Sequence, residues 1–369
     1  MHSDCGNHVH VGQANATESD EAGDNIRWTA LCTFSGIFRY HAGHHVPWRW
    51  GVTVEDIIRR YLQMRAKLLP SLVAGGHATT LSGWPLAARC DLHAPQCGMQ
   101  ARKAPNQFVF LNDTLVAPID DQLQGTKLAD NVTTRSVWLP PGTWTDAWTG
   151  QQTTVHSCGT SLNVTVPYER IPLWHRAGGL IVTAGSEPGL RAAEQDWRTL
   201  TLEVFPHAAN GDRTTAVRSS TSTQESVVTR RAVVERGVDG ARTELEMRTF
   251  DDRVQLNIGA TADGGPAERG WIVRLHLRPS QCVIGTRLVR LQHETSENNT
   301  AAASATLEVV HLAPLAADRP AVETFMPFGG AGSRPSQQHN LTGKRSGTTE
   351  GGTGGGQPSE RVYAEEPKA

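Results

Sequence analysis

The sequence predicts an α/β segment followed by β-domains, because one strong helical pattern gives way to many short strands. Apolar residues recur at helical spacing from Val54 to Leu69, which predicts an amphipathic helix that ends near Pro70. Residues 1–50 are rich in Gly, His and Trp and predict loops around short strands. Beyond Leu86, short apolar or alternating runs separated by turn residues are typical of β-sandwiches. The expected strands are 108–111, 115–117, 137–139, 162–166, 180–182, 200–204, 254–258, 272–277 and 307–309.

Composition excludes several classes of protein. The chain has 369 residues and a formal net charge of −2, so it has enough material for two or three domains. A charge this close to zero gives no electrostatic basis for a nucleic-acid partner or a membrane surface. No apolar run reaches the roughly 18–20 residues of a membrane-spanning helix, so no membrane span is predicted. The first ten residues are polar and do not form a signal peptide.

The cysteines and sequons bear on the compartment. The six cysteines form no C-x-x-C pair, so neither a metal site nor a cofactor is predicted. Cys90 and Cys97 either close a short loop in an oxidising compartment or remain thiols, and the sequence leaves both alternatives open. The sequon N-x-S/T occurs at Asn15, Asn112, Asn131, Asn163, Asn298 and Asn340. We therefore expect a glycoprotein of the secretory pathway (ER, lysosome or extracellular), although Asn112 lies in a motif expected to be buried.

The C-terminal residues have a different composition. From Gly329 onward, Gly, Ser, Thr, Gln and charged residues dominate. Such a segment cannot bury enough apolar surface to offset the entropy lost on ordering. We expect a disordered tail over residues 329–369.

A series of short motifs resembles glycoside hydrolase family 31, the α-glucosidase family. Residues 3–8 (S-D-C-G-N-H) are similar to the family's D-I-G-G-H/F segment. The motifs that follow in the family's order are R-W at 27–28, F-S-G-I-F-R-Y-H at 34–41, P-W at 47–48, R-A-K-L-L-P at 65–70, G-W-P-L-A-A-R at 83–89, F-L-N-D-T-L-V-A-P at 110–118, W-L-P-P-G-T-W-T-D-A-W-T-G at 138–150 and I-P-L-W-H-R-A-G-G at 171–179. Asn112 stands where the family has Gly, and beyond about residue 210 the strands are generic.

The resemblance implies an architecture. Residues 1–103 would be the end of a (β/α)8 barrel, with its seventh and eighth strands and its closing helix. Residues 104–190 would be the proximal C-terminal β-sandwich, and residues 191–328 the distal one. The barrel is expected to be incomplete, with most of its strands upstream of Met1.

The resemblance also bears on catalysis. Retaining glycosidases use two carboxyl groups about 5 Å apart. In the family both are Asp residues in motifs that precede the D-I-G-G-H segment, so no catalytic residue is assigned in this chain. Gly23-Asp24-Asn25 spells the family's acid/base motif, but it follows that segment, and Arg27-Trp28 keeps the register of the later R-W. We therefore expect Asp24 to be a turn or helix-capping residue.

Four residues are candidate substrate contacts: Asp4, Arg39, His41 and Trp48. By the resemblance, His41 matches a His that bonds a glucose hydroxyl, and Arg39 and Asp4 match a pair that lines the same pocket. Barrel enzymes bind ligands at the C-terminal ends of strands, where these residues should lie. Trp48 could stack on a sugar face. From the residues alone, a simple Arg39–Asp4 ion pair and a core His41 remain the alternative.

The resemblance implies a glycosidase. The full-length protein would hydrolyse O-glycosyl bonds of α-glucosides, with an α-linked glucoside or oligosaccharide as substrate, and this chain alone is expected to be inactive. The alternative is a non-catalytic carbohydrate-binding protein or a pseudoenzyme.

Overall fold

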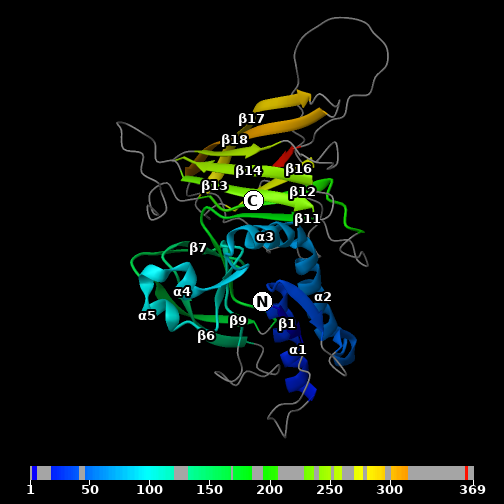
Figure 1. Cartoon of the computed structure of the whole chain (residues 1–369). Coiled ribbons are helices and arrows are strands. Elements are labelled where there is room, and N and C mark those ends of the chain that lie inside the picture. The colour runs from blue at the N-terminus through cyan, green and yellow to red at the C-terminus, as the bar shows by residue number, and fades with distance from the viewer. Residues whose placement is uncertain are drawn as a thin grey trace, which may run out of the picture.

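Helices occupy one part of the molecule and stacked β-sheets occupy the rest (Figure 1). The structure is a computed structural model. It describes residues 2–5, 18–40, 46–119, 132–167, 169–184, 194–206, 228–236, 241–250, 253–259, 270–276, 281–295, 301–314 and 362–364. Among these residues, no helix is both long enough and apolar enough to cross a membrane.

The N-terminal unit combines two parallel strands with three longer helices. Its elements are β1 (His2–Cys5), α1 (Glu18–Thr33), β2 (Ile37–Tyr40), η1 (Pro47–Trp50), α2 (Val52–Lys67) and α3 (Leu69–Ser82). β1 and β2 form a two-stranded parallel sheet, and α1 packs against both strands and against α2. The described residues contain no closed barrel, so the predicted end of a barrel is present as one strand pair with its helices.

The structure corrects the expected helices. The helix predicted from Val54 to Leu69 is present as α2 and buries Val54, Ile57, Ile58, Tyr61 and Met64. The other two long helices, α1 and α3, were not predicted. Residues 18–33 form α1 where loops were expected, and Pro70 lies in the first turn of α3 instead of ending the helical region. A proline is tolerated in the first turn because its missing N–H has no partner there anyway.

The next residues build a six-stranded sheet and a two-stranded ribbon. Their elements are β3 (Ala87–Arg89), α4 (Cys90–His93), η2 (Pro95–Cys97), α5 (Met99–Arg102), β4 (Phe108–Phe110), β5 (Thr114–Val116), β6 (Val132–Leu139), β7 (Gly142–Asp146), β8 (Gln152–Val155), β9 (Thr160–Pro167) and β10 (Leu173–Arg176). The sheet order is β3-β4-β5-β10-β7-β8, and β6 pairs with β9. Val137 and Leu139 of the ribbon share a core with Leu115 and Trp144 of the sheet.

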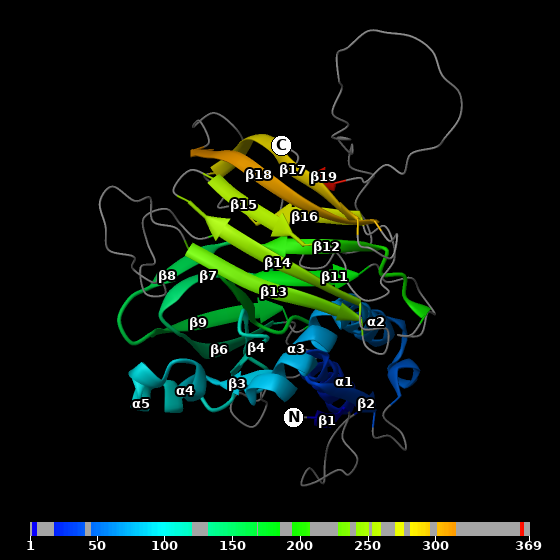
Figure 2. The same ribbon diagram turned by 45° about the horizontal axis from the view of Figure 1, so that its top comes forward.

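Two further sheets follow. One has the order β11-β12-β16-β19, from β11 (Leu180–Ala184), β12 (Thr199–Val204), β16 (Gly270–Leu275) and β19 (Val362–Ala364). The other has the order β13-β14-β15-β18-β17, from β13 (Val228–Arg236), β14 (Ala241–Thr249), β15 (Arg253–Ile258), β17 (Gln281–Thr295) and β18 (Ala301–Pro314). Leu200 and Leu202 of the first sheet share a core with Leu245, Met247 and Leu256 of the second. Figure 2 shows β13, β14 and β15 lying over β11, β12 and β16.

Every strand expected from the sequence is present, whereas the domain boundaries stay predictions. The strand expected at 162–166, for example, lies within β9. In the predicted disordered tail, residues 362–364 form β19 and pair with β16, which corrects the expectation for these three residues. The rest of residues 329–369 lies outside the described part of the chain.

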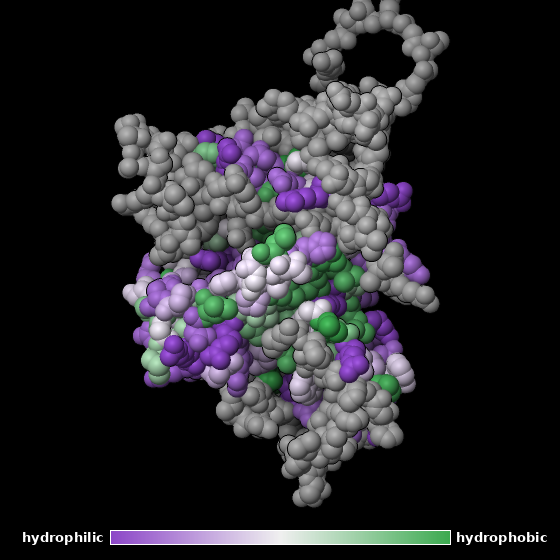
Figure 3. All heavy atoms as spheres, in the orientation of Figure 1, coloured by the Kyte–Doolittle hydropathy of each residue, from purple (hydrophilic) through white to green (hydrophobic). Residues whose placement is uncertain are grey.

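Specific hydrogen bonds join the helices to the sheets. Tyr61 Oη of α2 donates to the carbonyl of Glu169 at 2.7 Å and accepts from the backbone N–H of Ile171 at 2.9 Å. Ser71 Oγ of α3 donates to the carbonyl of Val182 at 2.9 Å and accepts from its N–H at 2.8 Å. Because β11 is an edge strand, Ser71 satisfies backbone groups that no neighbouring strand reaches. In Figure 3, apolar side chains gather across the middle of the molecule, where α3 lies in Figure 1.

Candidate functional site

The candidate site lies at the carboxyl ends of β1 and β2. The two strands pair in parallel, with Asp4 opposite Arg39 and Cys5 opposite Tyr40. Asp4 and Arg39 are therefore each one residue from the end of their strand. Because the carboxyl ends of parallel strands lie at one edge of a sheet, Cys5 and Tyr40 end their strands at the same edge.

Arg65 of α2 fixes the turn that leads into β2. Its guanidinium donates to the carbonyls of Thr33 at 3.1 Å and Gly36 at 2.8 Å, and also to that of Ser35. These carbonyls lie at and just beyond the end of α1, where backbone acceptors lack helical partners. Burial lowers the pKa of Arg65 to about 10, a range in which the side chain is still charged at neutral pH. The side chain of Arg65 thus fixes the backbone turn that precedes Arg39.

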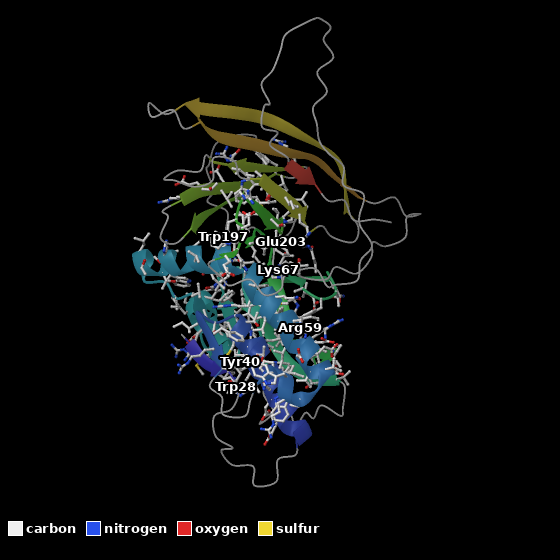
Figure 4. All side chains as sticks on the ribbon, turned by 90° about the vertical axis from the view of Figure 1, so that its right-hand side faces the viewer. Trp28, Tyr40, Arg59, Lys67, Trp197 and Glu203 are labelled. Atoms are coloured by element: carbon white, nitrogen blue, oxygen red, sulfur yellow. A yellow bond between two sulfur atoms is a disulfide. The ribbon has the colours of Figure 1, made fainter. Side chains whose placement is uncertain are left out.

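Two contacts tie α1 to the strand pair. A disulfide joins Cys5 at the end of β1 to Cys32 of α1, with their Cα atoms 6.2 Å apart. The hydroxyls of Thr29 and Tyr40 are 2.7 Å apart. Thr29 also donates to the carbonyl of Asn25 within α1. Burial raises the pKa of Tyr40 to about 12, against the smaller lowering effect of the bond to Thr29, so the phenol stays protonated. Tyr40 and Trp28 are labelled in Figure 4.

The structure places the candidate contacts unevenly. Arg39 lies on β2 with an exposed side chain. The backbone of Asp4 lies opposite it, but the side chain of Asp4 and all of His41 are outside the described residues. Trp48 lies in η1 and is 71% exposed. The convergence of Asp4, Arg39 and His41 therefore stays a prediction.

Asp24 occupies a different position from the expected one. It lies inside α1, which begins at Glu18, so the expectation of a turn or helix-capping residue is wrong. Its carboxylate accepts a hydrogen bond from Arg27 Nη2 at 2.8 Å, one helical turn away. This ion pair on the helix surface accounts for the residue.

The structure agrees with one of the two alternatives left open for Cys90 and Cys97, the one in which both remain thiols. Cys90 and Cys97 are both buried free thiols, so the short loop between them is not closed. The bond forms between Cys5 and Cys32 instead, a pair that sequence spacing did not single out. Among the described residues, no group of His, Cys, Asp or Glu side chains is arranged to hold a metal ion.

The most perturbed histidine lies far along the chain from the candidate site. His175 of β10 is buried beside Phe205, whose ring also stacks on His276 at a centroid distance of 4.2 Å. Burial, helped by the nearby His276, lowers the pKa of His175 to about 3, so it is neutral at physiological pH. Glu203 accepts from His276 Nε2 and from Arg274 Nη1, each at 2.7 Å.

This cluster lies at the junction between β10 and the ends of β12 and β16. Burial lowers the pKa of Lys67, with Arg274 also lowering it and Glu203 opposing them. Figure 4 shows Lys67 at the end of α2 that is nearest to Glu203. A shallow pocket lined by Ile26, Arg27, Ala30, Tyr61, Ile119, Arg170 and Ile171 likewise lies where helices meet a sheet, away from the strand ends.

Two parts of the chain match sequence models of one family. Residues 3–74 match the glycosyl hydrolases family 31 TIM-barrel domain, and residues 92–181 match the glycosyl hydrolase family 31 C-terminal domain. This portion of the chain belongs to glycoside hydrolase family 31. The family 31 portion thus contains the strand pair, its helices and most of the six-stranded sheet, in the order that the short motifs predicted.

Individual relatives share this portion. The chain is 26% identical over 186 residues to an α-xylosidase of Saccharolobus solfataricus, covering 49% of this chain and 23% of that protein. It is 26% identical over 198 residues to α-glucosidase 2 of Bacillus thermoamyloliquefaciens, covering 52% and 23%. The chain therefore spans about a quarter of the length of these curated relatives.

Solved structures share the fold. A Flavobacterium johnsoniae family 31 dextranase complexed with glucose aligns over 80% of this chain and 38% of its own, with a TM-score of 0.59 and 16% identity. A family 31 α-xylosidase of Xanthomonas citri aligns over 71% and 27%, with a TM-score of 0.55 and 22% identity.

Sequence reasoning missed the residues that support the site. Arg65 was part of a quoted motif but had no assigned role, because its three carbonyl acceptors lie about 30 residues earlier in the chain. The Thr29–Tyr40 contact depends on α1, which was not predicted. One feature of the sequence could have pointed to Arg65: it is a basic residue on the apolar face of a predicted helix.

Proposed function

We propose that this chain supplies part of the sugar-binding wall of a glycoside hydrolase that acts on α-glucosides in its full-length form. The observation that carries the proposal is the register of β1 and β2, which sets Asp4 opposite Arg39, two residues before His41. These residues lie in the portion that matches the family's barrel domain. Relatives named α-xylosidase and α-glucosidase support α-linked glycosides as the substrate class.

Each proposed contact has a chemical role. A neutral imidazole at His41 donates to and accepts from sugar hydroxyls at the same time. The guanidinium of Arg39 holds the carboxylate of Asp4 ionised and orients it toward a second hydroxyl. The exposed ring of Trp48 offers a flat apolar face to the C–H edge of a sugar. Together these groups bind and orient a glucosyl unit.

The proposal assigns hydrolysis to carboxyl groups outside residues 1–369. A retaining mechanism uses one carboxylate to attack the anomeric carbon and a second to protonate the leaving oxygen. Asp24 is paired with Arg27 on α1 and is given neither role. Orientation without a nucleophile or a proton donor yields binding, which does not lower the chemical barrier by itself.

The finer architecture and the compartment belong to the same proposal. We assign the sheets after residue 104 to two β-sandwiches, which is supported by the core shared within each pair of stacked sheets. The strand β11 pairs with β12 and belongs to the second sandwich, although it lies before the boundary expected near residue 190. We assign the full-length protein to the secretory pathway. The disulfide between Cys5 and Cys32 supports this assignment, since such bonds persist in oxidising compartments.

The test compares hydrolysis with binding in the purified chain. We expect no turnover of p-nitrophenyl α-glucoside above background in the wild type or in Asp24→Asn, because acid–base help of about 10²–10⁴-fold needs a positioned proton donor. We expect weak glucose binding by titration calorimetry, and we expect His41→Ala to abolish it. His156→Ala, which removes an exposed imidazole on the β8–β9 turn, is the matched control and should bind as the wild type does.

Two outcomes would contradict this assignment. Robust turnover that disappears in Asp24→Asn would make Asp24 a working acid/base. Glucose binding that is equal in the wild type, His41→Ala and His156→Ala would remove His41 from the sugar site.

A non-catalytic carbohydrate-binding role is the second candidate, and the exposure of Trp48 favours it. A binding module gains affinity with longer oligosaccharides because more sugar faces stack on aromatic rings. Isomaltotriose that binds much more tightly than glucose, with the gain lost in Trp48→Ala, would support this role. Equal affinity for both sugars would count against it.

A further inference from the structure

Two cysteines from distant parts of the chain meet beside the six-stranded sheet. Cys97 ends the short helix η2, and Cys158 lies in the turn between β8 and β9. Cys97 is 5% exposed, and the thiol of Cys158 lies close enough to raise its pKa. The Sγ atom of Cys158 also lies 3.7 Å from the carbonyl of Gln96, the residue that precedes Cys97. Both side chains pack on the core that contains Trp138.

The backbone around both cysteines is held in place. In η2, the N–H of Cys97 donates to the carbonyl of Ala94 at 3.0 Å. In the other turn, Gly159 has a φ of +88° and faces the Trp138 ring so closely that an added Cβ would lie 2.4 Å from it. The approach of the two thiols is therefore set by the fold and does not depend on a mobile loop.

The other cysteines whose side chains the structure describes are engaged elsewhere. Cys5 and Cys32 are already bonded to each other. The thiol of Cys90 is buried and contacts Gln107, whose amide accepts from the backbone N–H of Trp138 at 3.0 Å. Burial raises the pKa of Cys90 to about 11, as it does for Cys97, so the contact with Gln107 and not the pKa distinguishes Cys90.

We propose that Cys97 and Cys158 are a covalent cross-linking site that is oxidised to a disulfide in the mature protein. The oxidant is a small-molecule or protein disulfide. The thiolate of Cys158, the more exposed of the two, attacks it and forms a mixed disulfide, which releases one thiol of the oxidant. Cys97 then loses its proton and displaces the second thiol. Two protons and two electrons leave the pair, and one disulfide of the oxidant becomes two thiols.

The cross-link stabilises the segment of short helices between β3 and β4. It ties the short helices α4, η2 and α5 to the β8–β9 turn. In the loop-entropy description, closing a loop of about 60 residues restricts the unfolded chain strongly. Burial also raises the pKa of Cys97 to about 11, with Cys158 adding to the effect. Reaction of this pair at neutral pH is therefore slow without a catalyst, as suits a structural bond better than a rapid switch.

The first experiment maps the bond in the wild-type protein and needs no variant. The full chain is refolded in a mixture of reduced and oxidised glutathione, alkylated while denatured, and digested without reduction. We expect mass spectrometry to find the Cys97 and Cys158 peptides linked and Cys90 alkylated. Alkylation of both Cys97 and Cys158, in a sample whose Cys5–Cys32 bond is intact, would overturn the proposal, as would linkage of either one to Cys90 or Cys282.

The second experiment measures the effect on stability under the same oxidising conditions. We expect Cys158→Ser to lower the thermal midpoint by roughly 5–10 °C relative to the wild type. Cys90→Ser is the matched control, because it removes a thiol that the proposal leaves reduced, and the link between Cys97 and Cys158 should persist in it. A Cys158→Ser midpoint equal to that of the wild type would contradict a stabilising cross-link.

Discussion

His175 illustrates how one buried side chain sets a response to pH. Its Nδ1 lies 3.1 Å from the hydroxyl of Thr114, and its ring packs 4.5 Å from that of Phe205. The titratable neighbour His276 lies on the other side of Phe205 and donates to Glu203. Burial and the nearby His276 both oppose the charged form of His175, so its protonation in the fold carries a large cost in lost hydration.

We predict that acid destabilises the protein through His175. Its folded pKa of about 3 lies below the unfolded value of about 6.5, so the unfolded state binds the proton first as the pH falls. Stability is then fully present above pH 6.5 and is lost progressively toward pH 3, by on the order of 2 kcal/mol at pH 5. Urea unfolding of the wild type and His175→Gln between pH 5 and 7.5 should show a shallower pH slope in the variant.

His156→Gln, at an exposed position, should keep the wild-type slope. Equal slopes in the wild type and in His175→Gln would remove His175 as the cause.

Asn112 shows why one departure from the family pattern is tolerated. It stands where the family has Gly, and its φ is +65°, in the left-handed region that Gly adopts most easily. Asn is among the non-glycine residues that tolerate this region best. Its side chain accepts a hydrogen bond from Trp84 Nε1 at 2.6 Å, which gives the substitution a contact of its own.

At the scale of elements, α1 and β2 depend on a residue of α2. The last carbonyls of α1 and those of the turn after it meet the guanidinium of Arg65. Lysine offers a point charge with three rotatable donors, whereas the planar fork of Arg reaches several acceptors at fixed spacing.

We predict that Arg65→Met destabilises the N-terminal unit by about 2–3 kcal/mol, because charge-assisted hydrogen bonds are lost and partly buried carbonyls are left without partners. Arg65→Lys should lie between Arg65→Met and the wild type. Urea unfolding followed by tryptophan fluorescence measures the change. Arg60→Met, which removes an exposed Arg from the same helix, is the control, and an equal effect of both substitutions would show that Arg65 acts only through its charge.

The elements that the sequence predicted share strong periodicity. Helix α2 carries apolar residues every three or four positions, and in β9 exposed side chains alternate with partly or fully buried ones from Ser161 to Val166. Helix α1 was missed because Gly23, Asp24 and Asn25 interrupt its first turns with poor helix formers. Its tertiary contacts, including the bond from Cys32 to Cys5, outweigh that weak propensity. Disulfide partners cannot be read from spacing at all, because the fold decides which thiols meet.

The candidate site was predictable only in part. The order of motifs alone predicted that Asp4 and Arg39 lie near each other, and the strand register agrees with that order. What surrounds them was not predictable, because Arg65 and Thr29 reach the strand pair from helices through contacts far apart in sequence. The alternation of apolar and polar residues in strands and their period in helices carry no information on contacts between residues far apart in sequence.

At the scale of the whole molecule, helices and sheets are joined by a few polar contacts set in an apolar interface. Ser71 occupies the open edge of β11, and Tyr61 bridges the backbone just before β10. Burial raises the pKa of Tyr61 above its ordinary range, so its hydroxyl keeps its proton for the bond to Glu169.

We predict that Ser71→Ala lowers the free energy of unfolding by about 1–3 kcal/mol, because the N–H and the carbonyl of Val182 both lose their partner. Chemical denaturation measures the loss. Hydrogen exchange should show faster exchange at the Val182 amide. Thr80→Ala removes a hydroxyl that bonds only within α3 and should leave both measurements unchanged. Unchanged exchange at Val182 in Ser71→Ala would show that another group protects this amide.

The bond between Ser71 and Val182 joins residues 111 positions apart, and this separation has a consequence for biosynthesis. A ribosome adds roughly 5–20 residues per second, so α3 waits some 5–20 seconds before the strand that covers it has been made. During that interval α3 has neither β11 nor β13 to pack against. The nascent chain therefore exposes the apolar face of α3, and the speed of translation through residues 83–184 determines for how long.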